Sequence, residues 1–323
     1  MCVNKGNLLS LRQICIIFAL IKLLLMEKLL LTGASGFVGR NIKHSLQQLY
    51  CVTTCGISES DDVKANLATD VPHLPCTFDV VLHICGKAHT TPRTDAERQE
   101  FYDVNYTGTI NLCKALEKIG APKSLIYLSS VAVYGCESGT MITECHQLQG
   151  NTPYAHSKIL AEQYLTEWSR KHGVRLGILR AALIAGKDAP GNLGAMVSGI
   201  RRGIYFNIAG GKAEKSFLMV DDIVRLLPAV VAKGGIYNVC DSPHISFGQM
   251  AECIARQLGR KNPLSLPYAL AWCIAKAGDI IGSKAPFNSP KLAKMTQSLT
   301  FSNAKAREEL GWTPLDVLTH YHI

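Results

Sequence analysis

A glycine-rich turn near the start of the chain, between a short apolar segment and a helix, constrains the fold most strongly. Residues 29–32 are apolar up to a final threonine and predict a buried parallel strand, and a helix is expected to begin near Phe37. Gly33, Gly36 and Gly39 fall in this turn and the first helical residues. Glycine permits the tight turn and lets backbone N–H groups approach a pyrophosphate at the helix N-terminus, whose positive partial charge favours an anion. The segment therefore predicts a dinucleotide site.

The residues expected to hold this cofactor follow from the position of the turn. They are Gly33, Ser35, Gly36, Phe37, Val38, Gly39, Arg40 and Ser58. The second strand of such a unit normally ends in an acid that binds the ribose 2′-hydroxyl of NAD, but residues 55–58 contain none. Either Glu59 or Asp61 reaches that hydroxyl, or Ser58 and Arg40 accept the 2′-phosphate of NADP. The sequence is therefore compatible with either NAD or NADP as the cofactor.

Strand and helix signals continue to alternate through the first half of the chain. Further strands are predicted at 51–55, 80–85 and 124–129, and helices at 107–119 and 152–168. This alternation predicts an α/β fold with a doubly wound parallel sheet of the Rossmann type and a smaller C-terminal substrate-binding domain. We expect an NAD(P)-binding domain over residues 26–185 and a substrate-binding domain over 186–323, with some segments of the second returning to the first.

The segment from Tyr154 to Lys158 carries the candidate catalytic side chains. Because it lies in a predicted helix, the two residues share one face, one turn apart. A phenol with a pKa of about 10 is a weak base at neutral pH, and both the Lys158 ammonium and a positive nicotinamide ring are expected to lower that pKa. Ser130 ends an apolar strand at the sheet edge where ligands bind. Asn105 opens a predicted helix, as an N-cap, an active-site residue or both.

With the glycine turn, Asn105, Ser130 and the Tyr154–Lys158 pair in this order, the chain resembles the extended short-chain dehydrogenase/reductases, and among them the nucleotide-sugar epimerases and 4-reductases. The resemblance runs from about Met26 to Trp312. It implies that Tyr154 is the general base and acid, that Lys158 tunes its pKa and binds the cofactor ribose, and that Ser130 hydrogen-bonds the reacting oxygen. Asn105 is implied as a helix-positioning residue, and a homodimer is implied as the assembly.

The same resemblance limits the set of reactions expected of this chain. The dehydratases of the family carry an acid pair after the serine or threonine, whereas Val131 and Ala132 follow Ser130 here. Asn192 and Lys215 match substrate-binding positions that hold a nucleotide diphosphate in relatives, with Lys215 in place of a more usual arginine. The lead hypothesis is an NAD(P)-dependent epimerase acting at C4 of a UDP-hexose or UDP-N-acetylhexosamine for surface polysaccharide. The alternatives are an NAD(P)H-dependent reductase of a UDP-4-keto-6-deoxy-N-acetylhexosamine and a non-catalytic NAD(P)-binding regulator.

Composition excludes several other classes of protein. Hydrophobic residues make up 47% of the 323 residues, as in an ordinary globular protein. The formal net charge is +9, but the Lys and Arg residues are scattered, so no nucleic-acid partner is expected. The twelve cysteines show no zinc-ligand spacing, so we expect no metal and reduced thiols in the cytoplasm.

Two apolar segments raise the question of membrane contact. Residues 1–25 are basic and apolar, and their unbroken apolar run is too short to span a bilayer. We expect them to form an N-terminal extension outside the fold. Three interpretations of this extension remain: residues that precede a true start at Met26 and are absent from the native protein, a membrane-surface helix, or a secretory signal. Membrane association is expected only through these residues. Residues 266–281 are expected to form a helix that covers the substrate pocket rather than one that faces a membrane.

Overall fold

A parallel sheet of seven strands forms the centre of the computed structural model, which describes residues 26–281 and 287–323. The strand order is β12-β7-β5-β4-β1-β2-β3. The strands are β1 (Lys28–Thr32), β2 (Cys51–Gly56), β3 (Val63–Lys64), β4 (Val80–His83), β5 (Ser124–Ser130), β7 (Arg175–Ala181) and β12 (Gly235–Val239). The strand order runs outward in opposite directions from β1 and β4. The carboxyl ends of these two strands therefore mark the switch point where ligands bind in doubly wound sheets.

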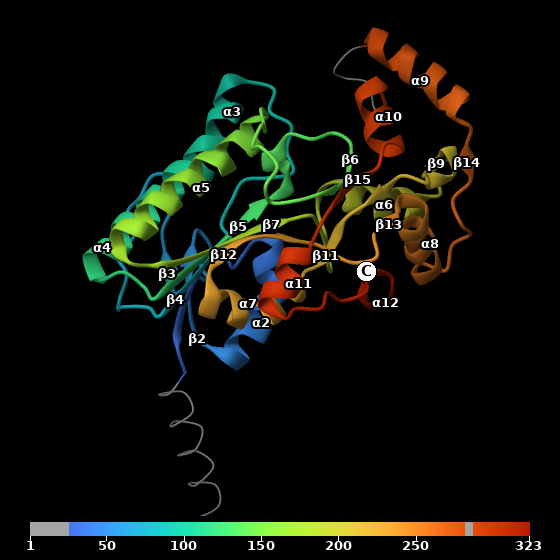
Figure 1. Ribbon diagram of the computed structural model, residues 1–323. Coiled ribbons are helices and arrows are strands. Elements are labelled where there is room, and N and C mark those ends of the chain that lie inside the picture. The colour runs from blue at the N-terminus through green and yellow to red at the C-terminus, as the bar shows by residue number, and fades with distance from the viewer. Residues whose placement is uncertain (1–25, 282–286) are drawn as a thin grey trace, which may run out of the picture.

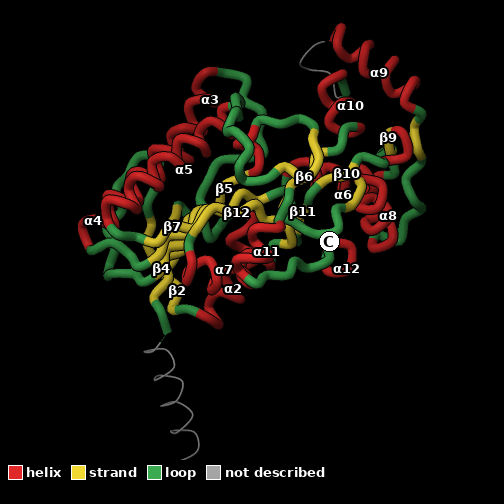
Figure 2. Tube along the Cα trace, viewed as in Figure 1, coloured by secondary structure: helices red, strands yellow, loops and turns green. Residues whose placement is uncertain are grey.

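Helices cover both faces of this sheet, as Figures 1 and 2 show. On one face lie α3 (Asp95–Tyr102), α4 (Gly108–Ile119) and α5 (Pro153–His172), and on the other lie α2 (Phe37–Leu49), α7 (Asp222–Lys233) and α11 (Ala304–Leu310). Each layer has its own apolar core: Leu112 and Leu165 belong to the first, and Leu46 and Leu227 to the second. The predicted doubly wound α/β fold is confirmed.

The rest of the chain forms a smaller region beside the carboxyl edge of the main sheet (Figure 1). Its strands are β6 (Gly139–Ile142), β8 (Leu183–Ala185), β9 (Asn207–Ile208), β10 (Glu214–Lys215), β11 (Phe217–Met219), β13 (Ile245–Ser246), β14 (Ser265–Leu266) and β15 (Leu299–Phe301). Its helices are α6 (Gly191–Arg202), α8 (Phe247–Gln257), α9 (Tyr268–Ile281), α10 (Ser289–Thr296) and α12 (Val317–His320). Met196 of α6, Ile254 of α8 and Val317 of α12 share one core.

Segments of the second half contribute directly to the main sheet. Strand β12 pairs in parallel with β7, with Gly235 opposite Gly177, and α7 packs against the same sheet. We infer that residues 26–185 form the NAD(P)-binding domain and that 186–323 form the substrate-binding domain, with α7, β12 and α11 as the returning segments. The extension predicted for residues 1–25 lies outside the described residues.

The helix that carries the catalytic candidates has well-defined ends. The Thr152 side chain caps α5 by accepting a hydrogen bond from the Ala155 N–H at 3.1 Å, and Pro153 occupies the first helical position. Gly173 ends the helix in the left-handed conformation, with φ of 67°. Both are frequent helix-end signals. The N-terminal one places Tyr154 and Lys158 in the first two turns of α5. The observed span is longer at its C-terminal end than the predicted 152–168.

Residues 26–281 and 287–323 contain neither a membrane-spanning helix nor a disulfide bond nor a cluster of metal ligands. No helix there has the length and hydropathy needed to cross a bilayer. Every cysteine in those ranges is a free thiol, as the sequence predicted. The same residues contain no group of three or more His, Cys, Asp or Glu side chains that could hold a metal ion.

Candidate active site

The glycine turn lies at the carboxyl end of β1, on the switch point of the sheet. Gly33 has φ of 78°, which side chains with a Cβ rarely adopt, and a Cβ on Gly39 would lie 2.4 Å from the Gly33 carbonyl oxygen. The N-cap of α2 is Gly36, which offers no side chain to the first N–H groups of the helix. Those N–H groups therefore remain available to a phosphate. The turn fits the pyrophosphate of a dinucleotide.

Replacing Gly39 with alanine is expected to weaken both folding and cofactor binding. The added Cβ meets backbone atoms that cannot move without shifting the turn, so we expect a loss of about 1–3 kcal/mol in the free energy of unfolding. Urea unfolding and a fluorescence titration with NADH or NADPH measure the two effects. Gly108→Ala is the matched control, because its Cβ would lie at an ordinary 3.4 Å from the Leu67 side chain. Equal stability of the two variants would contradict the close-packing argument.

A hollow of about 480 Å³ adjoins the turn where a cofactor ribose would lie. It is lined by Ala34, Ser35, Arg40, Lys43, Ser58, Ser60 and Asp61. The Asp61 carboxylate accepts a hydrogen bond from the Ser58 N–H at 3.0 Å, whereas Glu59 pairs with Lys64. Of the two acids considered for the ribose, Asp61 is therefore the one placed at the hollow. A carboxylate suits the hydroxyls of NAD and the two cations suit the 2′-phosphate of NADP, so both cofactors fit.

A buried histidine fixes the two strands at the switch point. The ring nitrogens of His83 lie 2.6 Å from the Thr32 hydroxyl and 2.9 Å from the Thr109 hydroxyl. Burial, with a smaller contribution from the nearby Lys158 ammonium, lowers the pKa of His83 to about 3. A neutral imidazole that joins β1, β4 and α4 is a structural cross-link rather than a proton carrier at neutral pH.

Tyr154 and Ser130 meet at the carboxyl end of β5. A hydrogen bond from the Ser130 hydroxyl to Tyr154 lowers the pKa of the phenol, but burial raises it more, so the net pKa lies above its ordinary value. The Ser130 oxygen also accepts the Ala132 N–H at 3.2 Å, which orients the hydroxyl. The two hydroxyls therefore lie close to each other, and the predicted bond from Ser130 to the reacting oxygen stays a prediction. The predicted lowering of the Tyr154 pKa is wrong for the chain alone, because burial dominates.

Lys158 is only 4% exposed and lies deeper than Tyr154. Its ammonium donates to the Leu128 carbonyl at 2.9 Å and lies 4.5 Å from the centre of the Tyr127 ring. Burial lowers the pKa of Lys158 to about 8. In this position a backbone carbonyl and an aromatic face stabilise its charge, while burial and Ser130 account for the shift in the pKa of Tyr154.

Asn105 is buried, with 1% exposure, and does not cap a helix. It lies in a π-helical turn, Asp103–Thr107, that joins α3 and α4 without a break, so the N-cap interpretation is wrong. Its amide donates to the Ser157 hydroxyl at 2.9 Å and to the Lys87 carbonyl at 3.1 Å, and its oxygen accepts the Lys87 N–H at 2.7 Å. Asn105 thus ties the loop after β4 to the helix that carries Tyr154.

The loop after β4 belongs to the site, although the sequence patterns did not single it out. A Cβ on Gly86 would lie 3.0 Å from the Asn105 side-chain oxygen and 3.2 Å from the Lys158 nitrogen, so these two side chains close around Gly86. The available signal was the loop's place after a buried strand that neighbours β1, at the edge where the glycine turn lies.

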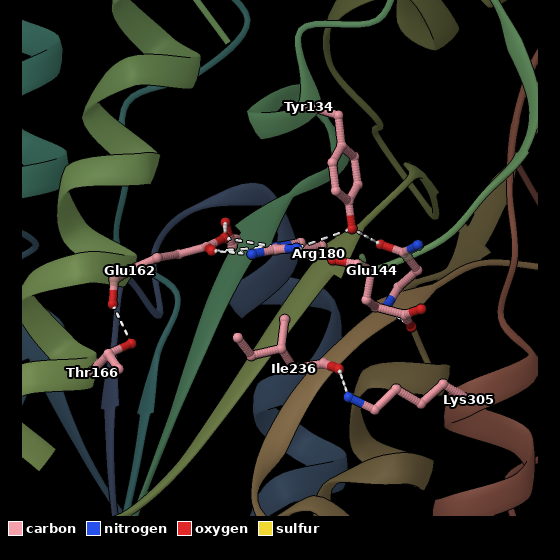
Figure 3. A network of polar contacts seen from close by, with 9 residues as sticks. Tyr134, Glu144, Glu162, Thr166, Arg180, Ile236 and Lys305 are labelled. Carbon is pink, nitrogen blue, oxygen red and sulfur yellow. Dashed lines mark hydrogen bonds and ion pairs between the residues drawn. The ribbon is translucent and has the colours of Figure 1, made fainter. Parts of the chain in front are cut away.

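A buried ion pair joins α5 to β7 (Figure 3). Arg180 of β7 donates to the Glu162 carboxylate of α5 at 2.7 Å, and their side chains are 5% and 4% exposed. Glu162 also accepts the hydroxyl of Ser129, the residue before Ser130. Arg180 reaches the Tyr134 hydroxyl at 3.1 Å, which in turn donates to Asn238 of β12. This network links α5, the end of β5, β7 and β12.

The two predicted substrate residues lie in the smaller region. Asn192 is exposed in the first turn of α6. Lys215 is 7% exposed in β10, and its ammonium donates to the Gln297 carbonyl at 2.7 Å. Burial lowers the pKa of Lys215 to about 8, with a further contribution from the nearby Lys294. Within the part of the chain that the structure describes, no hydrogen bond or ion pair joins either residue to Tyr154. Their role with substrate stays a prediction.

The fold and the glycine turn define a dinucleotide-binding protein of the doubly wound α/β class. The model of the NAD dependent epimerase/dehydratase family matches residues 29–240, about two thirds of the chain, and the chain belongs to that family.

Named relatives and solved structures agree with this assignment. The chain is 31% identical over 302 residues to N-acetyl-alpha-D-glucosaminyl-diphospho-ditrans,octacis-undecaprenol 4-epimerase of Escherichia coli O157:H7, covering 86% of this chain and 88% of that protein. It is 27% identical over 314 residues to a UDP-glucose 4-epimerase of Vibrio cholerae, covering 90% and 92%. The crystal structure of UDP-N-acetylglucosamine 4-epimerase from Bacillus cereus superposes with a TM-score of 0.69 at 19% identity, over 91% of this chain and 96% of that chain.

Proposed function

We propose that this chain is an NAD(P)-dependent epimerase that inverts C4 of a UDP-hexose or UDP-N-acetylhexosamine for surface polysaccharide. The observation that supports it best is the placement of Ser130, Tyr154 and Lys158 beside a glycine turn suited to a dinucleotide. Family membership and the 4-epimerase names of the relatives support the same reaction.

The proposed roles of the residues follow from their chemistry. A bound nicotinamide would supply the hydride acceptor for C4 of the sugar and the donor that restores the hydride on the opposite face. Tyr154 takes the proton of the C4 hydroxyl and gives it back, while Ser130 hydrogen-bonds the same oxygen. Lys158 holds the ribose of the cofactor, and Asn105 positions the helix and loop around it. The N–H groups from Gly33 to Gly39 would hold the pyrophosphate, and Ser58 and Arg40, which line the adjoining hollow, would bind the adenosine end.

Two related activities are separated by the requirement for a reductant. The apolar pair Val131 and Ala132 after Ser130 offers no acid or base for the loss of water, which disfavours dehydration. A reductase of a UDP-4-keto-6-deoxy-N-acetylhexosamine would use the same residues but consume NAD(P)H. A non-catalytic regulator is disfavoured, because Ser130, Tyr154 and Lys158 are all retained.

An assay of the purified chain tests the proposal. UDP-glucose, UDP-N-acetylglucosamine and a UDP-4-keto-6-deoxy sugar are incubated with and without NADH or NADPH, products are followed by chromatography, and the cofactor is followed by its absorbance. Interconversion of C4 epimers without net cofactor change is expected. Oxidation of NAD(P)H with the keto sugar alone would assign the reductase instead, and inactivity with all three sugars would refute both.

A second candidate substrate is a lipid-linked sugar diphosphate. The Escherichia coli relative is named for a sugar joined through diphosphate to undecaprenol, and helix α9 of this chain exposes large apolar side chains beside the smaller region. A diphosphate joins the sugar to its carrier in both candidates, so the same catalytic residues serve either one.

We further propose a cytoplasmic homodimer with no nucleic-acid partner.

Binding of UDP is expected to weaken as the pH rises from 7 to 9. Lys215 has a pKa of about 8 and therefore loses its positive charge above that pH, leaving the diphosphate without this cation. The dissociation constant should rise by up to about tenfold, the limit for one group titrated one pH unit above its pKa. Calorimetry measures it directly, without the chemical step to which Lys158 contributes.

Lys215→Arg is the control for this pH dependence. Arginine keeps its charge over the whole range, so the variant should show a nearly constant dissociation constant between pH 7 and 9. The ionisation of UDP itself enters both proteins equally. The same pH dependence in the wild type and in the variant would remove Lys215 from the diphosphate site.

A further inference from the structure

Helix α9 is apolar around most of its circumference. The exposed fractions are 52% for Tyr268, 47% for Trp272 and 89% for Ile280, and Leu270 and Ile274 are also exposed. Only a narrow stripe of small residues is buried: Ala271, Ala275 and Gly278. The two alanines pack against Leu292 of α10 and Ile208 of β9. The predicted helix is confirmed, but its interpretation as a pocket cover is wrong for these exposed side chains. Figure 1 shows the helix at the margin of the molecule.

Charged side chains are few on this helix. The helix carries one lysine and one acid, Lys276 and Asp279, and they pair with each other at 3.7 Å. Its other exposed residues are aromatic, aliphatic or small along the whole length of the helix. Large contiguous apolar patches on a folded chain mark a site of interaction with another apolar phase or partner.

The sequence around α9 is strongly basic. Between residues 256 and 297 there are seven Lys and Arg residues and one acidic residue, Asp279. In the described part of that range the basic residues are Arg256, Arg260, Lys261, Lys276, Lys291 and Lys294. Two copies of the chain facing each other through this helix would bring like charges together. An anionic lipid surface would instead be attracted by them.

The aromatic residues of α9 fit the same kind of surface. Tyr268 and Trp272 are one helical turn apart and both are exposed. Tyrosine and tryptophan favour the boundary between lipid tails and headgroups. Of the three tryptophans in the chain, Trp168 and Trp312 are each only 5% exposed, so Trp272 is the one placed at the surface.

We propose that α9 docks the protein on an anionic lipid bilayer, with the helix lying in the plane of the interface. Its 14 residues span about 21 Å, less than the roughly 30 Å of a bilayer core, which suits a helix that lies on the membrane. Docking would bring the site to sugar diphosphates carried on a lipid. That last step rests on the proposed function, whereas docking itself does not.

Vesicle binding by the full chain tests the proposal. Flotation is measured with vesicles of equal phosphatidylglycerol and phosphatidylcholine and with phosphatidylcholine alone. The wild type is expected to float with the anionic vesicles and to show a blue shift of tryptophan fluorescence, which Trp272→Phe removes. Leu270→Glu and Ile274→Glu should each lower the vesicle partition coefficient at least tenfold, because a charge replaces an exposed apolar side chain that the lipid would bury.

Leu49→Glu is the matched control, since Leu49 is 49% exposed on α2, among the helices over the main sheet. It should bind vesicles like the wild type, and all variants should keep the wild-type rate with a soluble UDP-sugar. Absence of wild-type flotation, or flotation of the two α9 glutamate variants at wild-type levels, overturns the proposal. So does a change from dimer to monomer in those variants without vesicles, which would assign α9 to a second copy. Vesicle binding by a chain inactive on every sugar would reject the proposed function and leave docking supported.

Discussion

Replacement of Tyr154 by phenylalanine is expected to lower kcat by about 10²- to 10⁴-fold, the range attributed to a positioned acid or base. The variant loses only the hydroxyl, while the ring keeps its edge contact with Phe101, whose centre lies 6.3 Å away. The glycine turn and Lys158 are unchanged, so the dissociation constant for the nicotinamide cofactor should stay within about twofold. Steady-state kinetics and fluorescence titration measure the two quantities.

Tyr102→Phe provides the control for this loss of a hydroxyl. Tyr102 lies on α3 near the same helix, and its hydroxyl contacts His156 at 3.3 Å, on the outer side of α5. Its replacement should leave kcat nearly unchanged. Wild-type turnover by the Tyr154 variant would remove that residue from the chemical step, and a parallel loss of cofactor affinity would assign it a binding role instead.

Truncation of Glu162 to alanine is expected to lower the free energy of unfolding by about 3–5 kcal/mol. The change leaves the guanidinium of Arg180 buried without its carboxylate and removes the acceptor of the Ser129 hydroxyl. Urea unfolding measures the effect. Because Glu162 lies one turn beyond Lys158 and also contacts the residue before Ser130, we expect kcat to fall as well.

Two further variants serve as controls for Glu162→Ala: one removes both charges of the buried pair, and the other breaks an exposed pair. Glu162→Leu combined with Arg180→Met removes both charges and should recover most of the lost stability, as replacement of buried ion pairs often does. Glu59→Ala breaks an exposed pair with Lys64 and should cost less than about 1 kcal/mol. A loss of the same small size in Glu162→Ala would show that the buried pair contributes no more than an exposed one.

The regular elements of the nucleotide-binding half were predictable because their signals are local. The start of β1 within one residue, the start of α2 at Phe37 and the strand that ends at Ser130 all follow from apolar runs and glycine positions in short windows. The one-turn spacing of Tyr154 and Lys158 is likewise a property of any helix. These features need no information about distant parts of the chain.

The polar environment of the site was not predictable in the same way. Asn105 precedes the expected helix start in the sequence, as an N-cap would, but α3 continues into α4 through the π-helical turn, so the residue is buried among Lys87 and Ser157. Arg180 and Glu162 lie 18 residues apart and become an ion pair only because β7 and α5 pack together. Contacts of this kind depend on the pairing of remote segments, which spacing along the chain does not encode.

The sequence by itself determined the class of fold, the glycine turn and the candidate catalytic residues, since each depends on side-chain chemistry within a helical turn or a strand. Only the tertiary structure decided the ionisation of those residues and the exposure of α9. Burial raises the pKa of Tyr154 and lowers that of Lys158 to about 8. The burial of a group depends on how many other segments surround it. In α9 the surrounding segments cover only the stripe of Ala271, Ala275 and Gly278, and the larger apolar side chains are left exposed.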